Sequence, residues 1–240
     1  MKKPLFYFVK KKYRGFTLVE LAIVLVIFGL IIATFLSPLS IQREIQGRRE
    51  TLDILNESKE ALIGYALING HLPCPDSKPI PDGLESRGGA DCVDDEGVMP
   101  WGTLGIERVD AWNHYIRYRV DATFSKSDVL FTIANAEGFS TIQINGEAGV
   151  SLVSLNSRPV AVLISHGSNG FGAINTIQTT NNKQPMPTGA DELQNANSNT
   201  TFVSHVPTPS GTVNEFDDIL LWISPKVLIN RMVAAEKLPS

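Results

Sequence analysis

The clearest pattern along the chain is an apolar run close to its N-terminus. Residues 21–36 read LAIVLVIFGLIIATFL and carry no charged side chain. With the apolar residues on either side, the run reaches about 20 residues, the length that a helix needs to cross roughly 30 Å of hydrocarbon. The pattern therefore predicts a membrane-spanning half-helix over residues 16–39.

The helical pattern continues beyond this run. Apolar residues recur at steps of 4, 7, 3, 7 and 4, which places them on one helix face: Ile41, Ile45, Leu52, Leu55, Leu62 and Ala66. Asn69-Gly70 is a helix stop signal. The pattern predicts one long helix over about 16–69, apolar all round in its first half and amphipathic in its second. Bends or breaks are expected at Gly29, Pro38 and Gly47.

The rest of the chain has the pattern of short strands between turns. Apolar or β-branched runs predict strands at 115–120, 129–133, 141–144, 150–155, 160–164 and 219–223. The Asn- and Thr-rich stretch 173–201 is typical of a long exposed loop. Ser224-Pro225 predicts the start of a short helix that ends near Lys237, with Ser as the N-cap and Pro at its first position.

These elements predict an α+β fold, in which one long N-terminal helix packs on an antiparallel sheet with long loops and a short C-terminal helix. They also divide the chain into three parts. Residues 1–15 form a basic leader, residues 16–39 the apolar half of the helix, and residues 40–240 the amphipathic half together with a globular head.

Charge is distributed unevenly along the chain. Six of the 21 basic residues lie in residues 1–15 without an acid, so the rest carries 15 basic against 25 acidic side chains. Basic residues next to a membrane helix stay in the cytoplasm, which places the head on the other side, in the periplasm. The acidic head argues against a nucleic-acid partner. Apolar residues at 43% of the chain exclude wholesale disorder.

Residues 12–21, KYRGFTLVEL, resemble the prepilin signal of type IV pilins and type II secretion pseudopilins. The resemblance implies that a membrane prepilin peptidase cuts after Gly15 and that the new N-terminal residue, Phe16, is N-methylated. Glu20 is the hallmark acid of this family. An ordinary secretory signal is disfavoured, because the residues after the apolar run offer a poor cleavage pattern.

The resemblance further implies a structural, non-enzymatic subunit that needs no cofactor. Its partners would be the prepilin peptidase, other pilin or pseudopilin subunits and an inner-membrane assembly platform. The subunit would move from the inner membrane into a pilus or pseudopilus. The amine created on Phe16 by cleavage would pair there with Glu20 of a neighbouring subunit, because pairing offsets the cost of a charge in a low dielectric.

Two alternatives remain open from the sequence. The first is a plain single-pass anchor that carries a periplasmic enzyme or binding protein, with Glu20 as an interfacial acid. The second lies within the family, where a pilus, a pseudopilus of protein secretion or a minor pilin of DNA uptake fits. A minor subunit is favoured over the major one because the head is large, and Glu20 argues against the largest tip pseudopilins, which usually lack this acid.

The head contains few residues that suggest chemistry. Cys74 and Cys92 are the two cysteines, and an even pair in an oxidising periplasm predicts a disulfide. The segment Ser165-His166-Gly167-Ser168 is not a nucleophile elbow, which needs G-x-S-x-G.

Two acidic runs offer oxygen ligands that suit calcium. The first contains Asp91, Asp94 and Asp95, and the second is Asp217-Asp218. The spacing of the first matches no EF-hand loop. We therefore favour solvated acidic loops, and no metal site is predicted.

Overall fold

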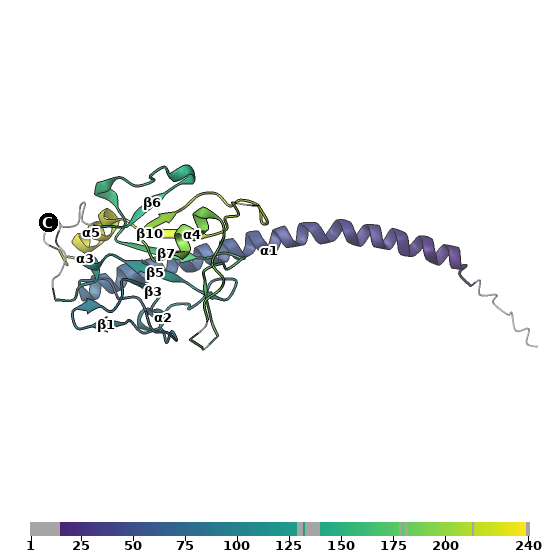
Figure 1. Ribbon diagram of the computed structural model, residues 1–240. Helices are drawn as coiled ribbons and strands as arrows, with labels where there is room; N and C mark the ends of the chain where they lie inside the picture. The colour runs from purple at the N-terminus through teal and green to yellow at the C-terminus, as the bar shows by residue number, and fades with distance from the viewer. Residues whose placement is uncertain are drawn as a thin grey trace, which may run out of the picture. The chain divides into compact units, whose positions relative to one another are not determined.

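The computed structural model describes residues 15–128, 132, 140–177, 179–180, 182–212 and 214–238, without the side chains of 33–40. The chain divides into two compact units, Met1–Glu44 and Ile45–Ser240. The helices are α1 (Leu18–Asn69), α2 (Trp101–Leu104), α3 (Ala122–Ser125), α4 (Ala190–Ala196) and α5 (Pro225–Ala234), with short 3-10 turns η2 (Glu147–Gly149) and η3 (Leu155–Ser157). Figure 1 shows their order along the chain.

The second unit is built around a four-stranded antiparallel sheet with the order β10-β7-β5-β3. Its strands are β3 (Glu96–Val98), β5 (Arg117–Val120), β7 (Ala161–Ser165) and β10 (Ile219–Ile223). Short pairs surround it: β1 (Arg87–Gly88) with β2 (Asp91–Cys92), β4 (His114–Tyr115) with β8 (Ile174–Asn175), and β6 (Gln143–Asn145) with β9 (Thr201–Val203). The predicted α+β class and antiparallel sheet are confirmed, and the arrangement is consistent with a pilin-like fold.

The central strand β7 is buried on both faces, which explains its unbroken apolar sequence. Successive side chains of a strand point to opposite faces. Ala161 and Leu163 accordingly belong to one core cluster and Val162 and Ile164 to a second. The first cluster contains residues of α1, α5 and the sheet, and the second contains β6, β9 and Phe216. The sheet therefore has a helical layer on one face and the β6–β9 pair on the other.

The face of α1 that packs in this unit is lined by small residues. Its buried positions follow one another at helical spacing: Gly47, Thr51, Leu55, Ser58, Leu62 and Ala66. The predicted stripe is correct for its last three members, whereas Ile41, Ile45 and Leu52 stay 61%, 45% and 39% exposed. Small side chains thus alternate with leucines along the buried stripe.

Gly47 does not break the helix, contrary to the prediction, because α1 is continuous from Leu18 to Asn69. A Cβ atom built on Gly47 would lie only 3.0 Å from the Trp112 indole. The glycine is therefore explained by the space that the indole needs, and tertiary packing offsets the roughly 1 kcal/mol that glycine costs in a helix.

Three of the predicted loop and strand assignments need correction or fall outside the structure. Residues 150–155 form no strand, since they contain a single bridge at Ser151 and then enter η3. The stretch 173–201 is not a continuous loop, because it includes β8 and the helix α4, whose Glu192 and Asn195 are buried. The predicted strand 129–133 lies almost entirely outside the described residues.

The pairing of β6 with β9 is parallel. Two parallel strands run in the same direction, so the chain must return to the end at which the first strand began. The connection between them is therefore long. Here it includes β7, β8 and α4. This long-range pairing could not be read from local alternation in the sequence.

The C-terminal helix α5 follows its sequence signals. It begins at Pro225 after Ser224, and it buries Leu228, Ile229 and Met232 against the helical side of the sheet. The Ser224 side chain makes no capping hydrogen bond, and the helix ends at Ala234, before the predicted end near Lys237.

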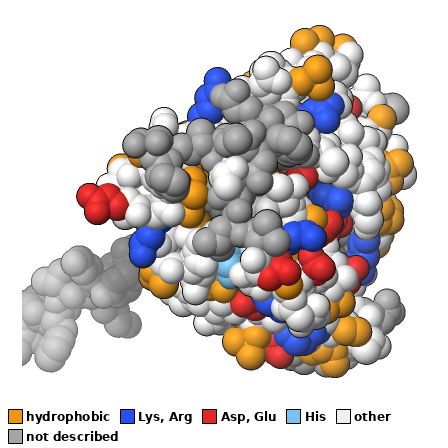
Figure 2. Space-filling model, turned by 90° about the vertical axis from the view of Figure 1, so that its left-hand side faces the viewer, with side chains coloured by type: hydrophobic (Ala, Val, Ile, Leu, Met, Phe, Trp, Pro, Cys, Tyr) orange, Lys and Arg blue, Asp and Glu red, His pale blue; other side chains and the backbone are white. Residues whose placement is uncertain are grey.

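Figure 2 shows the charge on one face of the molecule, where Lys and Arg side chains are interspersed with Asp and Glu among the described residues. Mixed signs of this kind are typical of a soluble surface.

A disulfide joins the segment after α1 to strand β2. Cys74 and Cys92 lie with their Cα atoms 5.3 Å apart and their sulfurs bonded. Cys74 is completely buried, and its backbone N–H donates to Glu85 Oε2 at 3.0 Å. The bridge closes the loop that contains β1 and restricts the unfolded chain.

Replacing Cys74 by Ser should lower the free energy of unfolding by roughly 2–4 kcal/mol, because the loop-closure constraint on the unfolded chain is lost. Urea unfolding of the purified full chain, followed by tryptophan fluorescence, measures the change. Cys92→Ser is the matched control, since it removes the same bond and should match Cys74→Ser. A reductant should destabilise only the wild type. If both variants unfold at the wild-type midpoint, the bridge does not stabilise the head.

Candidate functional site

The predicted cleavage site lies directly in front of helix α1. Gly15 and Phe16 are in non-helical backbone, and the Phe16 side chain is 81% exposed. No other part of the described chain comes within 4 Å of a Cβ built on Gly15. Within the described chain, the peptide bond between these residues is therefore accessible to a peptidase. Residues 1–14 of the predicted leader lie outside the described residues.

Helix α1 begins with a capping box formed by Thr17 and Glu20. The Glu20 backbone N–H donates to Thr17 Oγ1 at 3.2 Å, and the Thr17 backbone N–H donates to Glu20 Oε2 at 2.9 Å. This reciprocal pair satisfies two backbone donors that a helix N-terminus otherwise leaves free. The T-x-x-E spacing of residues 17–20 is the sequence signal for this cap, although the cap was not among the predicted features.

Only one oxygen of the Glu20 carboxylate, Oε2, accepts hydrogen bonds from the described residues. The Thr17 hydroxyl also donates to Oε2, at 2.9 Å, so both side-chain contacts converge on the same oxygen. Oε1 accepts no hydrogen bond from the described residues. A carboxylate can accept several donors, so the cap leaves room for a second partner of Glu20.

The helix that follows exposes apolar side chains around its circumference. Between residues 18 and 32 the large apolar side chains are from 46% exposed at Val24 to 85% exposed at Leu18. Contiguous apolar exposure on this scale marks an interaction surface. In the described part of the chain, no helix meets the combined length and hydropathy required of a membrane span.

The Ser165–Ser168 segment forms structural hydrogen bonds. Ser165 Oγ donates to Asp110 Oδ2 at 2.6 Å, and Ser168 Oγ donates to Asp217 Oδ2 at 2.9 Å. His166 Nδ1 lies 3.2 Å from Asp218 Oδ1. Each serine therefore donates to a carboxylate, whereas a nucleophilic serine needs a histidine partner.

The first acidic run does not assemble a ligand group within the described residues. Asp91 pairs with Lys126 at 3.2 Å, and Asp94 lines a separate cavity. The pKa of Asp95 is raised, chiefly by burial. The structure instead brings Glu192, Asp217 and Asp218 together, with one oxygen of each within 4.8 Å of the others.

These three carboxylates belong to the buried part of the head. Asn169 Nδ2 and the Asp217 backbone N–H both donate to Glu192 Oε1 at 3.0 Å. Burial and the nearby Asp218 charge raise the pKa of Glu192 to about 7, and burial raises that of Asp217. Their oxygen atoms suit a hard cation. The sequence pointed to Asp217 and Asp218 but missed Glu192, which only the folding of α4 brings near.

The raised pKa of Glu192 predicts a pH dependence of stability. A carboxyl with a raised folded pKa contributes most below its unfolded pKa, near 4.5, and the contribution is lost as pH rises to about 7. Glu192→Gln should therefore be more stable than wild type at pH 8, by about 1–2 kcal/mol after allowance for screening by water, and this difference should shrink as pH falls toward 4.5.

Urea unfolding of the full chain in a chelating buffer between pH 4.5 and 8 measures this difference. Glu50→Gln, on the exposed face of α1, is the matched control and should follow the wild-type curve. Parallel curves for Glu192→Gln and wild type would contradict the raised pKa.

Comparison with known proteins identifies the N-terminal segment. Residues 10–36 match the family model described as the prokaryotic N-terminal methylation motif. No curated protein and no solved structure matches the chain. The match includes Gly15, Phe16, the capping box and most of the apolar run, so the resemblance noted in the sequence is confirmed. Residues 10–36 thus carry the prokaryotic N-terminal methylation motif, the hallmark of type IV pilin and pseudopilin precursors.

Proposed function

We propose that this chain is a structural, non-enzymatic subunit of a type IV pilus or a type II secretion pseudopilus, processed by prepilin peptidase after Gly15 and N-methylated on Phe16. The observation that carries the proposal is the methylation motif at residues 10–36. The exposure of Phe16 and the absence of described neighbours around Gly15 support it, since a peptidase must reach the bond between them.

The proposed division of the chain follows from this processing. Residues 1–15 are a leader that is removed, residues 16–39 are the half of the helix held in the inner membrane or the filament core, and residues 40–240 carry the periplasmic head. The apolar exposure of residues 18–32 supports this division, because such a surface requires a non-aqueous environment. Moving from lipid into a filament core exchanges one apolar environment for another.

In the assembled filament, Glu20 acts as a register device. Cleavage leaves a positive amine on Phe16, and Glu20 Oε1 of a neighbouring subunit is available to accept from it. The cap through Thr17 holds the carboxylate at a fixed place on the helix while it does so. Partners are other pilin or pseudopilin subunits and the inner-membrane assembly platform. A minor subunit is favoured, because the second unit extends over Ile45–Ser240.

The rival function is an anchored periplasmic enzyme or binding protein that never enters a filament. It shares the apolar segment with the subunit but not the need for Glu20. Variants at Gly15 and at Glu20 therefore separate processing from assembly.

Gly15→Val should abolish cleavage, because a branched side chain beside the cut bond does not fit a pocket that accepts glycine. The precursor should accumulate at full length, whereas wild type should lose residues 1–15 and gain one methyl group on Phe16. Intact-mass measurement of protein from cells with active prepilin peptidase distinguishes the two. Gly29→Val is the matched control: it also lies in open space on the described chain and should be cleaved normally. Wild type recovered uncut would overturn the proposal.

Glu20 has two roles that one substitution cannot separate, so two variants are needed. Glu20→Ala removes both the cap and the charge, whereas Glu20→Gln keeps an oxygen that accepts from Thr17 but carries no charge. If the charge sets the register, both variants should be inserted and cleaved, and both should be depleted at least tenfold from sheared filaments. Immunoblots of membrane and filament fractions give the readout.

Other outcomes of this experiment lead to distinct conclusions. Normal assembly of Glu20→Gln with failure of Glu20→Ala would show that only the cap matters. Equal incorporation of Glu20→Ala and wild type would refute the pairing with Phe16. If cleaved wild type is absent from every filament and pilin complex, the anchored-protein rival is correct.

A further inference from the structure

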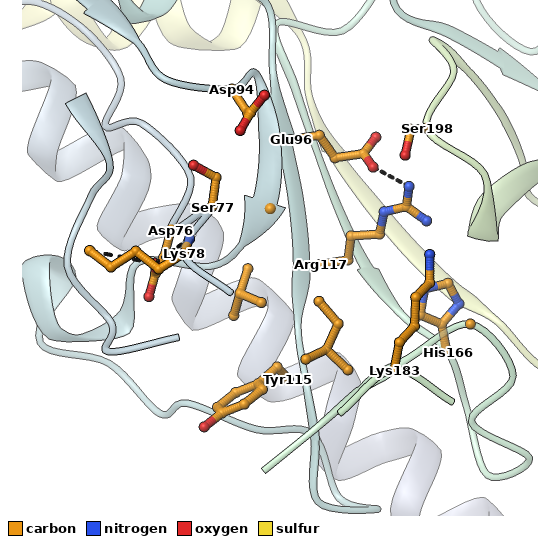
Figure 3. A pocket seen from close by; sticks show the side chains of 14 residues that line it. Asp76, Ser77, Lys78, Asp94, Glu96, Tyr115, Arg117, His166, Lys183 and Ser198 are labelled. Atoms are coloured by element: carbon orange, nitrogen blue, oxygen red, sulfur yellow. Dashed lines mark hydrogen bonds and ion pairs between the residues drawn. The ribbon is translucent and has the colours of Figure 1, made fainter. Parts of the chain in front are cut away.

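The head contains a cavity of about 220 Å³ that the proposed function does not use. It lies between the segment Asp76–Lys78, strand β3, strand β5 and the region around β8 (Figure 3). Figure 3 draws Asp94 and Ser77 on one side and Arg117, Lys183 and His166 on the other. A cavity below the roughly 300–1,000 Å³ of drug-sized sites takes a small molecule or a single unit of a larger one.

One wall of the cavity is a buried polar network. The Arg117 guanidinium donates to the backbone oxygens of Asn195 and Asn197 and to Glu96. Asn195 Nδ2 donates to Asp218 Oδ2 at 2.8 Å, and Asp218 Oδ1 lies 3.2 Å from His166 Nδ1. Asn195 and His166 are at most 1% exposed. Buried networks of this kind are rigid when their members are satisfied.

The network leaves one open position, at His166 Nε2. This atom is buried and has no hydrogen-bond partner in the described part of the chain. Because a carboxylate can only accept, Nδ1 carries the proton of the contact with Asp218, and in the neutral form of the ring Nε2 is then the acceptor nitrogen. A buried acceptor without a partner is costly. A ligand in the cavity that satisfies it must offer an O–H or N–H group.

Lys183, in contrast, calls for a negatively charged acceptor on the ligand. Its side chain lines the cavity, and it makes no ion pair or hydrogen bond with the described residues. Burial and the neighbouring Arg117 lower its pKa. The nearby carboxylate of Glu96 is already held by Arg117 and by Arg119, the latter at 3.0 Å. The ammonium group therefore has no carboxylate partner among the described residues, and a ligand carboxylate would provide one.

The other polar groups around the cavity include the carboxylate of Asp94 and the hydroxyls of Ser77 and Ser198. Asp94 is exposed and has no ion pair among the described residues, and Ser77 and Ser198 also line the space. Lys78 differs from Lys183, because Asp82 and Asp76 hold it at 2.8 and 3.5 Å. Asp94 and the serines can bind hydroxyl groups on the part of a ligand that lies away from Lys183.

We propose that this cavity binds a small hydroxy acid, with its carboxylate on Lys183 and a hydroxyl donating to His166 Nε2. A sugar acid has both groups on one ring and additional hydroxyls for Asp94 and the serines. The inference is independent of the proposed function, since every residue involved lies in the second unit and none is part of the N-terminal motif.

Three probes separate the carboxylate contact with Lys183 from the hydroxyl contact with His166. D-glucuronate offers carboxylate and hydroxyls, D-glucose offers hydroxyls alone, and acetate offers the carboxylate alone. Calorimetric titration of the purified full chain should give the lowest Kd for D-glucuronate, with the other two at least tenfold weaker. D-glucuronate and D-glucose should shift the imidazole nitrogen resonances of His166, and acetate should leave them unchanged.

Lys183→Gln tests the carboxylate contact. Because the Lys183 side chain is exposed, this substitution should not disturb folding. It should weaken D-glucuronate at least tenfold and leave D-glucose unchanged. Lys126→Gln is the matched control, because Lys126 pairs with Asp91 and does not line the cavity. Equal D-glucuronate affinity in Lys183→Gln and wild type overturns the proposal. So does the absence of D-glucuronate binding to wild type.

Discussion

The fold of the head depends on the burial of one face of helix α1 in its core. That face carries Gly47, Thr51, Ser58 and Ala66 in addition to leucines. The Trp112 indole fills the space that Gly47 leaves, and the Ala111 backbone N–H donates to the Thr51 hydroxyl at 3.2 Å. A larger residue at position 47 would collide with the Trp112 indole, so this part of the helix and the Ala111–Trp112 segment constrain each other.

A second constraint acts at the other end of the helix, where Glu20 caps the helix and, in the proposed function, also pairs with a neighbouring subunit. A helix that starts beside an apolar segment needs its backbone donors satisfied, because water is scarce there. The capping box does this with Oε2, which fixes the carboxylate close to the cleavage site. A charge in such a position is costly when isolated. Pairing with a newly formed amine would remove that cost only after cleavage, which links processing to assembly.

Sequence patterns predicted the elements that local chemistry determines. The end of α1 at Asn69, strands β7 and β10 and the start of α5 at Pro225 follow from apolar runs and stop signals. Helix α4 was missed because its seven residues are mostly polar, and long-range contacts of Glu192 and Asn195 hold it in place. The N-terminal site is a continuous motif and could be read directly. The cavity joins distant segments, so only the fold brings its residues together.

The determinants of the two regions are therefore physically separate. The proposed cleavage site and the cap involve Gly15, Phe16, Thr17 and Glu20, which are nearly consecutive, so they can form whatever head follows them. The cavity depends on Asn195 accepting from Arg117 while donating to Asp218, and a change in either contact would disturb the position of His166. Buried polar networks are a weak source of stability compared with apolar packing. Placing such a network beside an open cavity is better explained by recognition than by stability, because an apolar wall would hold the sheet equally well.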